Sequence, residues 1–423
     1  MKLFKHIVLT TIVLSSACIM VHAQDSRTYI NANVERSAGF YHSYEAPEGD
    51  YLSGSRPKGY KPFYISHYSR HGSRWHASEP RYFGTLAFFE KGDSLGVLTE
   101  TGKRLLKDLR VIAADADGRL GDLSPRGVRE HKGIADRMYR TYPEVFKKGA
   151  TVDSRSSVYV RCVLSMCAFN ESLKEHVPSL VMERESSKKA MRVLCHSNGD
   201  AGYGRELTSL ADSLRKAWIS TDDFMNRLFT DRGAYLQGLI RDEQSLMYDC
   251  FELAGTMQCC DYLGIDLYYI FNQQEIYDLW RYLNAYAYSL FGPAEKYGDC
   301  HLNDSKVLLR DFIDRADAVL AGKSHNAADL RFGHDANIIP LVSLMGIKSS
   351  SARVMVEDVT EAWNISEVSP MAANLQMIFF RDRKNNIKVR VLYNEKDAEL
   401  PIEGSPFYDW KTLRQYLVSK CEN

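Results

Sequence analysis

Residues 63–76, FYISHYSRHGSRWH, place two guanidinium groups around one imidazole at the end of a stretch that alternates like a strand. Arg70 and Arg74 carry forked donors that suit phosphate oxygens, and Gly72 lets the backbone turn sharply and approach a ligand. An imidazole can attack phosphorus only if cations cancel the repulsion of the phosphate oxygens. The same cations lower the pKa of His71 and keep its lone pair free at mildly acidic pH. The cluster indicates phosphoryl transfer, and the alternative is a solvated basic turn.

A second cluster, Gly333-His334-Asp335, follows a short strand-like run and precedes an apolar helix. Asp335 could simply cap that helix. A helix N-terminus is also an anion site, however, and a histidine with a carboxylic acid supplies another phosphate donor and a proton for the leaving alkoxide. The two clusters together favour a phosphatase.

The elements around these clusters predict an α/β core. Alternation marks 63–71 as a strand, and ligands collect beyond the carboxyl ends of strands in an open α/β sheet. From about 171 to 325 long helical patterns dominate, so a mostly helical segment interrupts the core. Caps, periodicity and turn residues also predict helices over 99–118, 124–146 and 337–345, a strand leading into a helix over 151–169, and a hairpin of 375–381 with 387–393.

Several stretches resemble one known family. RHGSR, followed far downstream by FGHDANIIPLVSLMGI, is similar to the histidine phosphatase superfamily, in its branch of acid phosphatases, phytases and multiple inositol polyphosphate phosphatases. LSPRGVREHKGIADRMYRTYPEVF, SSVYVRCVLSM and VRVLYNEKDAELPI resemble further segments of that branch. The resemblance implies an α/β fold with a phosphoglycerate-mutase-like core sheet flanked by helices and a mostly α-helical cap inserted. The implied parts are a core of 24–170 and 326–423 and a cap of 171–325, after a signal peptide of 1–23.

The resemblance also implies roles for single residues. His71 would be the nucleophile that forms a phosphohistidine, and Asp335 would protonate the leaving group and then activate water. Arg155 and Arg161 both compete for the third arginine position, and Arg161 is preferred because it directly precedes the Cys-containing helix start. The implied phosphate-binding residues are Arg70, Arg74, Arg161 and His334.

The substrate prediction rests on the same resemblance and on a basic run in the helical segment. Lys188, Lys189 and Arg192 could contact extra phosphates of an inositol polyphosphate such as phytate, or form a solvated helix face. Asp335 directly follows His334, as in acid phosphatases and bacterial phytases, whereas inositol polyphosphate phosphatases usually carry Ala-Glu there. A broad acid phosphatase for sugar or nucleotide phosphates is therefore the alternative. An inactive phosphate-binding module is a third reading, which the intact His71 and Asp335 disfavour.

The N-terminal residues have the pattern of a secretory signal. Lys2 and Lys5 precede an apolar run of 7–21, and Ala23 ends a small-x-small cleavage pattern. The sequence therefore predicts a secreted or periplasmic protein cut after Ala23. Lipidation at Cys18 is a weaker alternative, because the usual leucine three residues earlier is missing.

Charge and cysteine content narrow the possible partners. The chain carries 54 basic and 54 acidic residues, so nothing global points to nucleic acid or an acidic membrane. Eight cysteines would remain after cleavage, and their spacing selects no disulfide pairing and no zinc site. We expect a small phosphorylated substrate, no cofactor and no metal; the sequence does not predict an oligomeric state.

Overall fold

The computed structural model describes residues 25–47, 56–194, 204–232 and 242–422. The predicted signal peptide, its cleavage site and Cys18 lie outside these ranges, so the secretory interpretation stays a prediction. Among the described residues, no helix is both long and apolar enough to cross a bilayer. Seven cysteines fall within the described ranges, and none of them is in a disulfide there.

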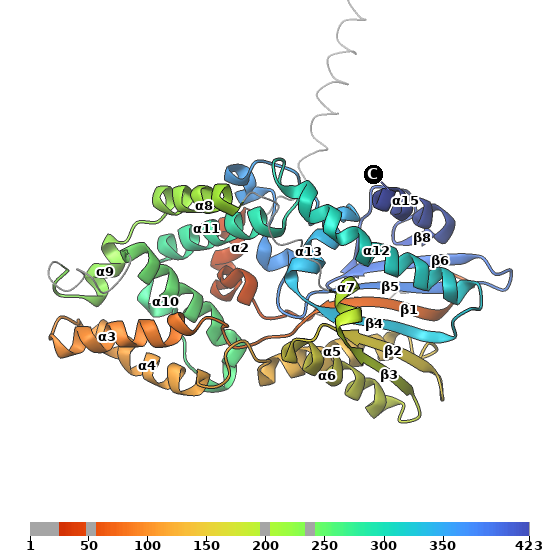
Figure 1. The fold of residues 1–423 in the computed structure, drawn as a ribbon, viewed down its shortest axis with the longest axis horizontal. Coiled ribbons are helices and arrows are strands. Elements are labelled where there is room, and N and C mark those ends of the chain that lie inside the picture. The colour runs from red at the N-terminus through yellow and green to blue at the C-terminus, as the bar shows by residue number, and fades with distance from the viewer. Residues whose placement is uncertain (1–24, 48–55, 195–203, 233–241, 423) are drawn as a thin grey trace, which may run out of the picture.

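A mixed sheet forms the centre of the molecule (Figure 1). Its order is β3-β2-β4-β1-β5-β6-β7, with β8 pairing on β6. The neighbours β3, β2, β4 and β1 are parallel, whereas β5 runs antiparallel to β1 and forms the predicted hairpin with β6. The strands are β1 (Lys61–Arg70), β2 (Thr151–Ser156), β3 (Val181–Ser186), β4 (Asn326–Gly333), β5 (Asn374–Arg381), β6 (Ile387–Tyr393), β7 (Lys396–Asp397) and β8 (Phe407–Asp409).

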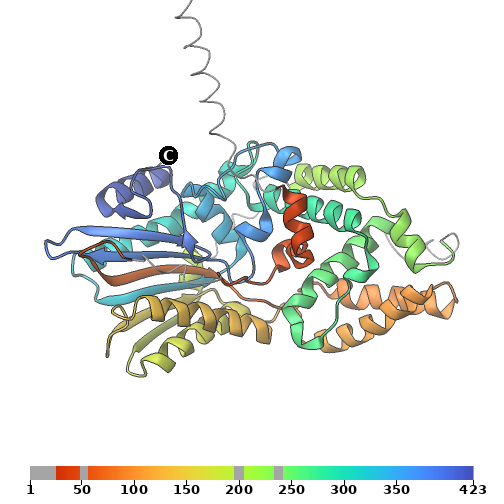
Figure 2. The same cartoon turned by 180° about the vertical axis from the view of Figure 1, so that it is seen from behind.

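Helices cover both faces of this sheet. The paired helices α5 (Pro125–Thr141) and α6 (Val160–His176) lie on one face, and α12 (Gly298–Leu320), α13 (Asp335–Leu344) and α15 (Trp410–Glu422) lie on the other (Figures 1 and 2). Thr99 and Ser124 cap the two predicted helices by accepting backbone N–H bonds, as their sequences indicated. The predicted α/β fold with a helix-flanked sheet is confirmed.

A second, helical part lies beside the sheet (Figure 2). It contains α8 (Gly204–Trp218), α9 (Asp222–Leu228), α10 (Glu243–Met257) and α11 (Gln273–Phe291). The remaining helical elements are α2 (Ser26–Ala32), α3 (Thr85–Ser94), α4 (Glu100–Ala116), α7 (Lys188–Leu194), α14 (Ile365–Val368), and the short η1 (Val34–Tyr41), η2 (Pro80–Gly84), η3 (Gln258–Leu263), η4 (Tyr268–Ile270) and η5 (Val356–Glu361).

The predicted helical segment 171–325 contains one strand and a helix that packs on the sheet, and its domain limits stay a prediction. β3 lies inside that range but pairs with β2 at the sheet edge, and α12 packs over the sheet. Conversely, α3 and α4 precede the range, yet α4 packs against α9 and α3 against α10. The strand was missed because VMERES is an exposed edge with little apolar alternation.

A network of ion pairs connects α12 to the strands of the sheet. Asp311 of α12 accepts from Arg155 of β2 and from Arg331 of β4, with N–O distances of 2.8 and 2.7 Å. Arg331 is fully buried, and Arg315 joins the network through Asp153 and Asp329. Burial alone would raise the pKa of Asp311, but Arg331 and Arg155 outweigh it and hold that pKa well below its usual value.

Replacing Asp311 by asparagine should therefore destabilise the fold. It removes the carboxylate closest to two buried guanidinium groups, a loss of about 3–5 kcal/mol in the free energy of unfolding at pH 7. Because the pKa of Asp311 is lower folded than unfolded, this stabilisation is present above about pH 4 and fades as the pH falls further. Urea unfolding at several pH values measures it. Asp314→Asn, on the exposed side of the same helix, is the control, and a pH-independent difference would contradict the argument.

Candidate active site

Two parallel strands bring the two predicted clusters together. β1 ends at Arg70 and β4 at Gly333, and these residues are partners in the register of the pair. The backbone N–H of His71 donates to the carbonyl of Gly333 at 2.9 Å. The imidazole rings of His71 and His334 lie with centroids 5.5 Å apart, at an interplanar angle of 71°. Residues far apart in the chain thus lie together at the carboxyl ends of two neighbouring strands.

The loop after β1 packs directly on α5. A Cβ atom at Gly72 would lie 2.6 Å from the carbonyl oxygen of Gly127, and one at Gly127 would lie 2.3 Å from that of Ser73. The buried carboxylate of Glu130 accepts from both the N–H and the hydroxyl of Ser73, each at 2.7 Å. Gly72 is therefore required by contact with a helix, a reason that the sequence alone did not reveal.

His71 is held as a neutral imidazole with a defined tautomer. Its Nδ1 lies 3.0 Å from the carbonyl oxygen of Gly72, which can only accept, so Nδ1 carries the proton and Nε2 the lone pair. Burial, followed by the nearby Arg70 and Arg74, lowers the pKa of His71 well below its usual value. The lone pair on Nε2 is therefore free even in acid.

Three arginines offer buried donors around this imidazole. Arg70 is fully buried and donates through Nη1 to the carbonyl of Ser369 at 2.7 Å. Arg74 donates through Nη1 to the hydroxyl of Tyr41 and the carbonyl of Trp75. Within the described part of the chain, Nε of Arg70, Arg74 and Arg161 is buried and has no hydrogen-bond acceptor. An anion among these groups would satisfy donors that the protein leaves unpaired.

Arg161, and not Arg155, joins this group. Arg161 lies in the first turn of α6, with its guanidinium 4.8 Å from the ring centre of Tyr159. Burial lowers its pKa, and Arg74 lowers it further, since the two cations are near each other. Arg155 points into the network around Asp311 instead. The preference for Arg161 from sequence thus agrees with where the side chains lie.

His334 and Asp335 occupy the start of α13. His334 precedes the helix, and its pKa falls to about 4, first through burial and then through Arg161. Nη2 of Arg70 lies 2.9 Å from Oδ2 of Asp335, but the pair is not aligned as a hydrogen bond. Burial alone would raise the pKa of Asp335, yet Arg70 and His334 together hold it below its usual value. The carboxyl group is thus ionised in this state.

The predicted basic run lies beside these residues. α7 follows β3 at the same edge of the sheet, and the sulfur of Met191 accepts from the N–H of Val158 at 3.4 Å. Lys188, Lys189 and Arg192 are exposed on this helix. The carbonyl oxygen of Leu194, at the end of α7, lies close to Gly333, and the role of the three cations stays a prediction.

Other histidines have different surroundings. His67 is fully buried between Phe169 and Phe332, with ring centroids 5.0 and 5.6 Å away, as a core residue would be. His76, at the end of the first cluster, is buried, and its Nε2 lies 3.2 Å from a carboxylate oxygen of Glu252 on α10. The sequence missed this contact because it depends on how α10 packs.

Further residues of the site gave little signal in the sequence. Ser157 places its hydroxyl 3.1 Å from Nε2 of His334, and Tyr159 packs edge-on against the same ring at 4.9 Å. Tyr41 accepts from Arg74. Only the position of Ser157 and Tyr159 just before Arg161 could have drawn attention to them.

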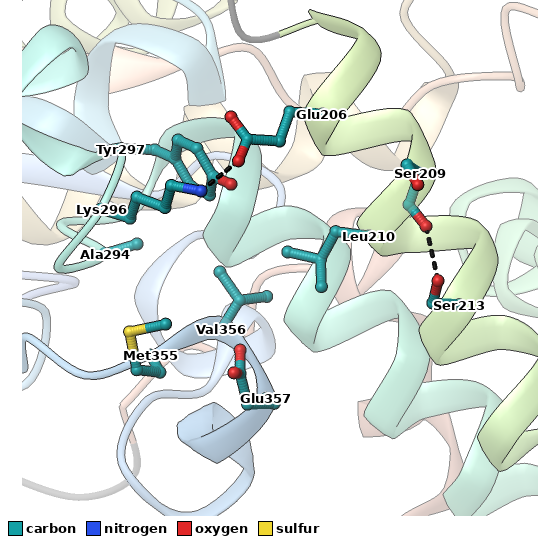
Figure 3. Close-up of a pocket in the computed structure, with 10 residues that line it drawn as sticks. All are labelled: Glu206, Ser209, Leu210, Ser213, Ala294, Lys296, Tyr297, Met355, Val356 and Glu357. Atoms are coloured by element: carbon teal, nitrogen blue, oxygen red, sulfur yellow. Dashed lines mark hydrogen bonds and ion pairs between the residues drawn. The ribbon is translucent and has the colours of Figure 1, made fainter.

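A separate pocket lies in the helical part (Figure 3). It encloses about 310 Å³ between α8 and the segment leading into η5, and it contains none of the residues discussed above. Lys296 pairs with Glu206 across it. In the described ranges, no three His, Cys, Asp or Glu side chains are grouped to hold a metal ion. The expectation of metal independence stays a prediction.

Comparison with known proteins bears on this arrangement. Residues 240–394 match the family model described as histidine phosphatase superfamily (branch 2). A stretch of 101 residues is 28% identical to Multiple inositol polyphosphate phosphatase 1 from Dictyostelium discoideum, and it covers 22% of this chain and 16% of that protein. The match therefore spans less than a fifth of that relative's length.

Solved structures extend the likeness to most of the chain. Multiple inositol polyphosphate phosphatase from Bifidobacterium longum, in complex with inositol hexasulfate, gives a TM-score of 0.72 at 20% identity, covering 90% of this chain and 97% of that one. The phytase from D. castellii gives 0.70 at 16% identity, covering 92% and 86%. At such identities the likeness concerns the fold, and it agrees with the predicted architecture.

Proposed function

We propose that this chain, whose residues 240–394 match the histidine phosphatase superfamily (branch 2), is a histidine phosphatase that hydrolyses phosphate monoesters of inositol polyphosphates through a phosphohistidine intermediate. One observation carries the proposal. His71 has a free lone pair on Nε2, and buried, unpaired donors of three arginines surround it. The relatives named above, an inositol polyphosphate phosphatase and a phytase, support the substrate class.

The first chemical step would follow from this geometry. Nε2 of His71 attacks phosphorus, and the P–N bond forms as the ester P–O bond breaks. Arg70, Arg74 and Arg161 hold the charge that spreads over the phosphate oxygens in the transition state. Asp335, beside Arg70, gives its proton to the departing alkoxide.

The second step would return the enzyme to its starting state. Asp335, now ionised, takes a proton from a water molecule, whose oxygen attacks phosphorus. The P–N bond breaks, inorganic phosphate leaves, and the electron pair returns to Nε2 of His71. The proton taken from water restores the acid form of Asp335, so the cycle balances.

Asp335 must gain its proton with the substrate. In the ligand-free state its pKa is held down by Arg70 and His334. A phosphate dianion among the arginines would offset the charge of Arg70 and raise the pKa of the carboxyl group. Substrate binding would thus prepare the acid that the first step needs.

Phosphate release from phytate, a glucose phosphate and an aryl phosphate, measured side by side, tests the proposal. We expect kcat/KM for phytate to exceed that for the glucose phosphate by about tenfold or more, equivalent to 1.4 kcal/mol of differential binding. Equal values would favour the broad acid phosphatase. No release from any of the three would favour a module that only binds phosphate.

The exposed cations of α7 provide a second prediction. Changing Lys188, Lys189 and Arg192 together to alanine should raise KM for phytate about tenfold, since each exposed ion pair contributes about 0.2–1 kcal/mol. KM for an aryl phosphate, which has one phosphate only, should change less than about twofold.

A matched triple variant controls for net charge. Three exposed cations lie far from the site, near the first residues of β1 and the start of α15, whereas the site lies at the carboxyl end of β1. They are Arg383, Lys384 and Lys411. Their replacement by alanine removes the same charge and should leave both KM values unchanged. If the two triple variants had equal effects on KM, Lys188, Lys189 and Arg192 would form only a solvated helix face and would not bind substrate.

A further inference from the structure

Among the described residues, the side-chain hydroxyl of Ser157 has one hydrogen-bond partner, the imidazole of His334. Its hydroxyl oxygen lies 3.1 Å from Nε2 of His334, and both side chains are buried. The backbone of Ser157 is fixed on two sides: its N–H donates to the carbonyl of Phe332 at 2.9 Å, and its carbonyl accepts from the hydroxyl of Ser186 at 3.1 Å. The hydroxyl is thus held in place beside His334.

The direction of this bond follows from the need to satisfy a buried hydroxyl. The hydroxyl of Ser157 contacts no other acceptor in the described ranges, so its proton has Nε2 as its one acceptor. The neighbouring thiol of Cys162, 3.6 Å from Nε2, donates instead to the carbonyl of Gly333 at 3.3 Å. If Nε2 carried the proton, the Ser157 hydroxyl would be buried without an acceptor.

The tautomer of His334 decides what it can offer a phosphate. Burial and Arg161 keep His334 neutral down to a pKa of about 4, so only one ring nitrogen carries a proton at mildly acidic pH. A lone pair facing a phosphate oxygen is repelled, whereas an N–H donates to it. Nδ1, the nitrogen that Ser157 does not use, lies 4.0 Å from the sulfur of Cys162 and has no hydrogen bond to a protein nitrogen or oxygen in the described part of the chain.

We propose that Ser157 is a positioning residue: it donates to Nε2 of His334 and thereby holds the Nδ1–H tautomer, whose N–H donates to the substrate phosphate. This inference rests on the proposed phosphatase function. Ser157 touches neither substrate nor His71 in this scheme, and it acts only through His334. The ring of Tyr159, edge-on at 4.9 Å and 89°, limits rotation of the imidazole and supports the same orientation.

Histidine ¹⁵N chemical shifts of the whole protein test the tautomer without any turnover. At pH 6.5 we expect the wild-type His334 signals, assigned through their loss in His334→Gln, to be those of the Nδ1–H form. Ser157→Ala should move them towards the Nε2–H form. A wild-type spectrum of the Nε2–H form would overturn the proposal, whatever the activity.

Kinetics provide the second measurement. Ser157→Ala should lower kcat/KM for phytate by about 10- to 100-fold, the effect of losing one hydrogen bond to a charged group. Ser157→Thr, which keeps a hydroxyl, should recover most of the loss. Thermal unfolding separates these effects from misfolding, and if the alanine variant does not fold, the threonine variant and the wild-type spectrum still decide.

Ser156 supplies a matched control. Its hydroxyl is also buried, in the preceding residue, and has no hydrogen-bond partner in the described ranges. Ser156→Ala should leave the His334 signals and kcat/KM unchanged. If the two alanine variants lose activity equally while His334 keeps its tautomer in both, the role of Ser157 is only structural. An inactive wild type with the expected tautomer would instead count against the proposed function alone.

Discussion

His71→Ala should abolish phosphate release, with a fall in kcat of about 10⁴-fold or more, because it removes the atom that attacks phosphorus. The arginines and His334 would remain, so the variant should still bind phosphate or a slow substrate analogue. Circular dichroism and thermal unfolding should show a folded protein. An alanine variant with wild-type kcat would rule out this nucleophile.

The intermediate can be detected directly. Wild-type enzyme mixed with labelled phytate and quenched within milliseconds in alkali should carry phosphate that acid releases, as expected of a phosphorus–nitrogen bond. His71→Ala should carry none. His325→Ala is a matched control, since His325 is exposed before β4, at the opposite end of that strand from the site. Labelled phosphate that survives acid would point to a different nucleophile.

The low pKa of His71 also predicts how the rate depends on pH in acid. Its pKa lies well below the usual value because of burial and the nearby Arg70 and Arg74. Protonation of the nucleophile therefore should not limit the rate at pH 4–5, although an ordinary histidine, with a pKa of about 6.5, would be mostly protonated there. An acidic optimum is compatible with a histidine nucleophile for this reason.

The sequence could predict the reacting residues because local rules place them. Strand alternation carries His71 to the carboxyl end of β1, and His334 follows β4 in the same way. Parallel strands end at one edge, so their terminal residues meet wherever the strands are neighbours. Neither segment alone predicts that β1 pairs with β4, yet this pairing is what brings His71 and His334 close together.

The residues that support the site escaped prediction for a tertiary reason. Glu130 reads as one more charged residue on an exposed helix, yet it is buried against Ser73 because α5 packs on the loop through Gly72 and Gly127. Ser157 is one of two adjacent serines, and only the fold distinguishes it from Ser156. Polar residues acquire such roles from the partners that packing gives them.

The surface that each helix of the predicted 171–325 segment covers was hard to predict for a related reason. Periodicity identifies a helix but not the surface that it covers. α12 is amphipathic like its neighbours in the chain, but its polar face carries Asp311 and Arg315, which pair with charges on the strands. A charged residue inside a strand such as Arg331 is the one local sign that a polar helix face covers the sheet there.

Replacing Asp335 by asparagine should slow the reaction of substrates with poor leaving groups much more than that of substrates with good ones. An alkoxide of inositol needs a proton as it departs, so kcat for phytate should fall about 10²- to 10⁴-fold. An aryl oxide leaves with little help, so formation of the phosphohistidine from an aryl phosphate should slow by less than about tenfold. Burst kinetics measure that step apart from hydrolysis. Equal losses for both substrates would mean that Asp335 is not the acid.

The pH profile of the same variant completes the argument. Arg70 holds the pKa of Asp335 down in the free enzyme, and bound phosphate should raise that pKa by offsetting the charge of Arg70. A group that must be protonated loses activity as pH rises through its pKa, so kcat for phytate should fall on the alkaline side, with an optimum below neutrality. In Asp335→Asn that alkaline fall should disappear, because no carboxyl remains to titrate. An optimum above neutrality in the wild type, or an unchanged alkaline fall in the variant, would assign the proton to another group.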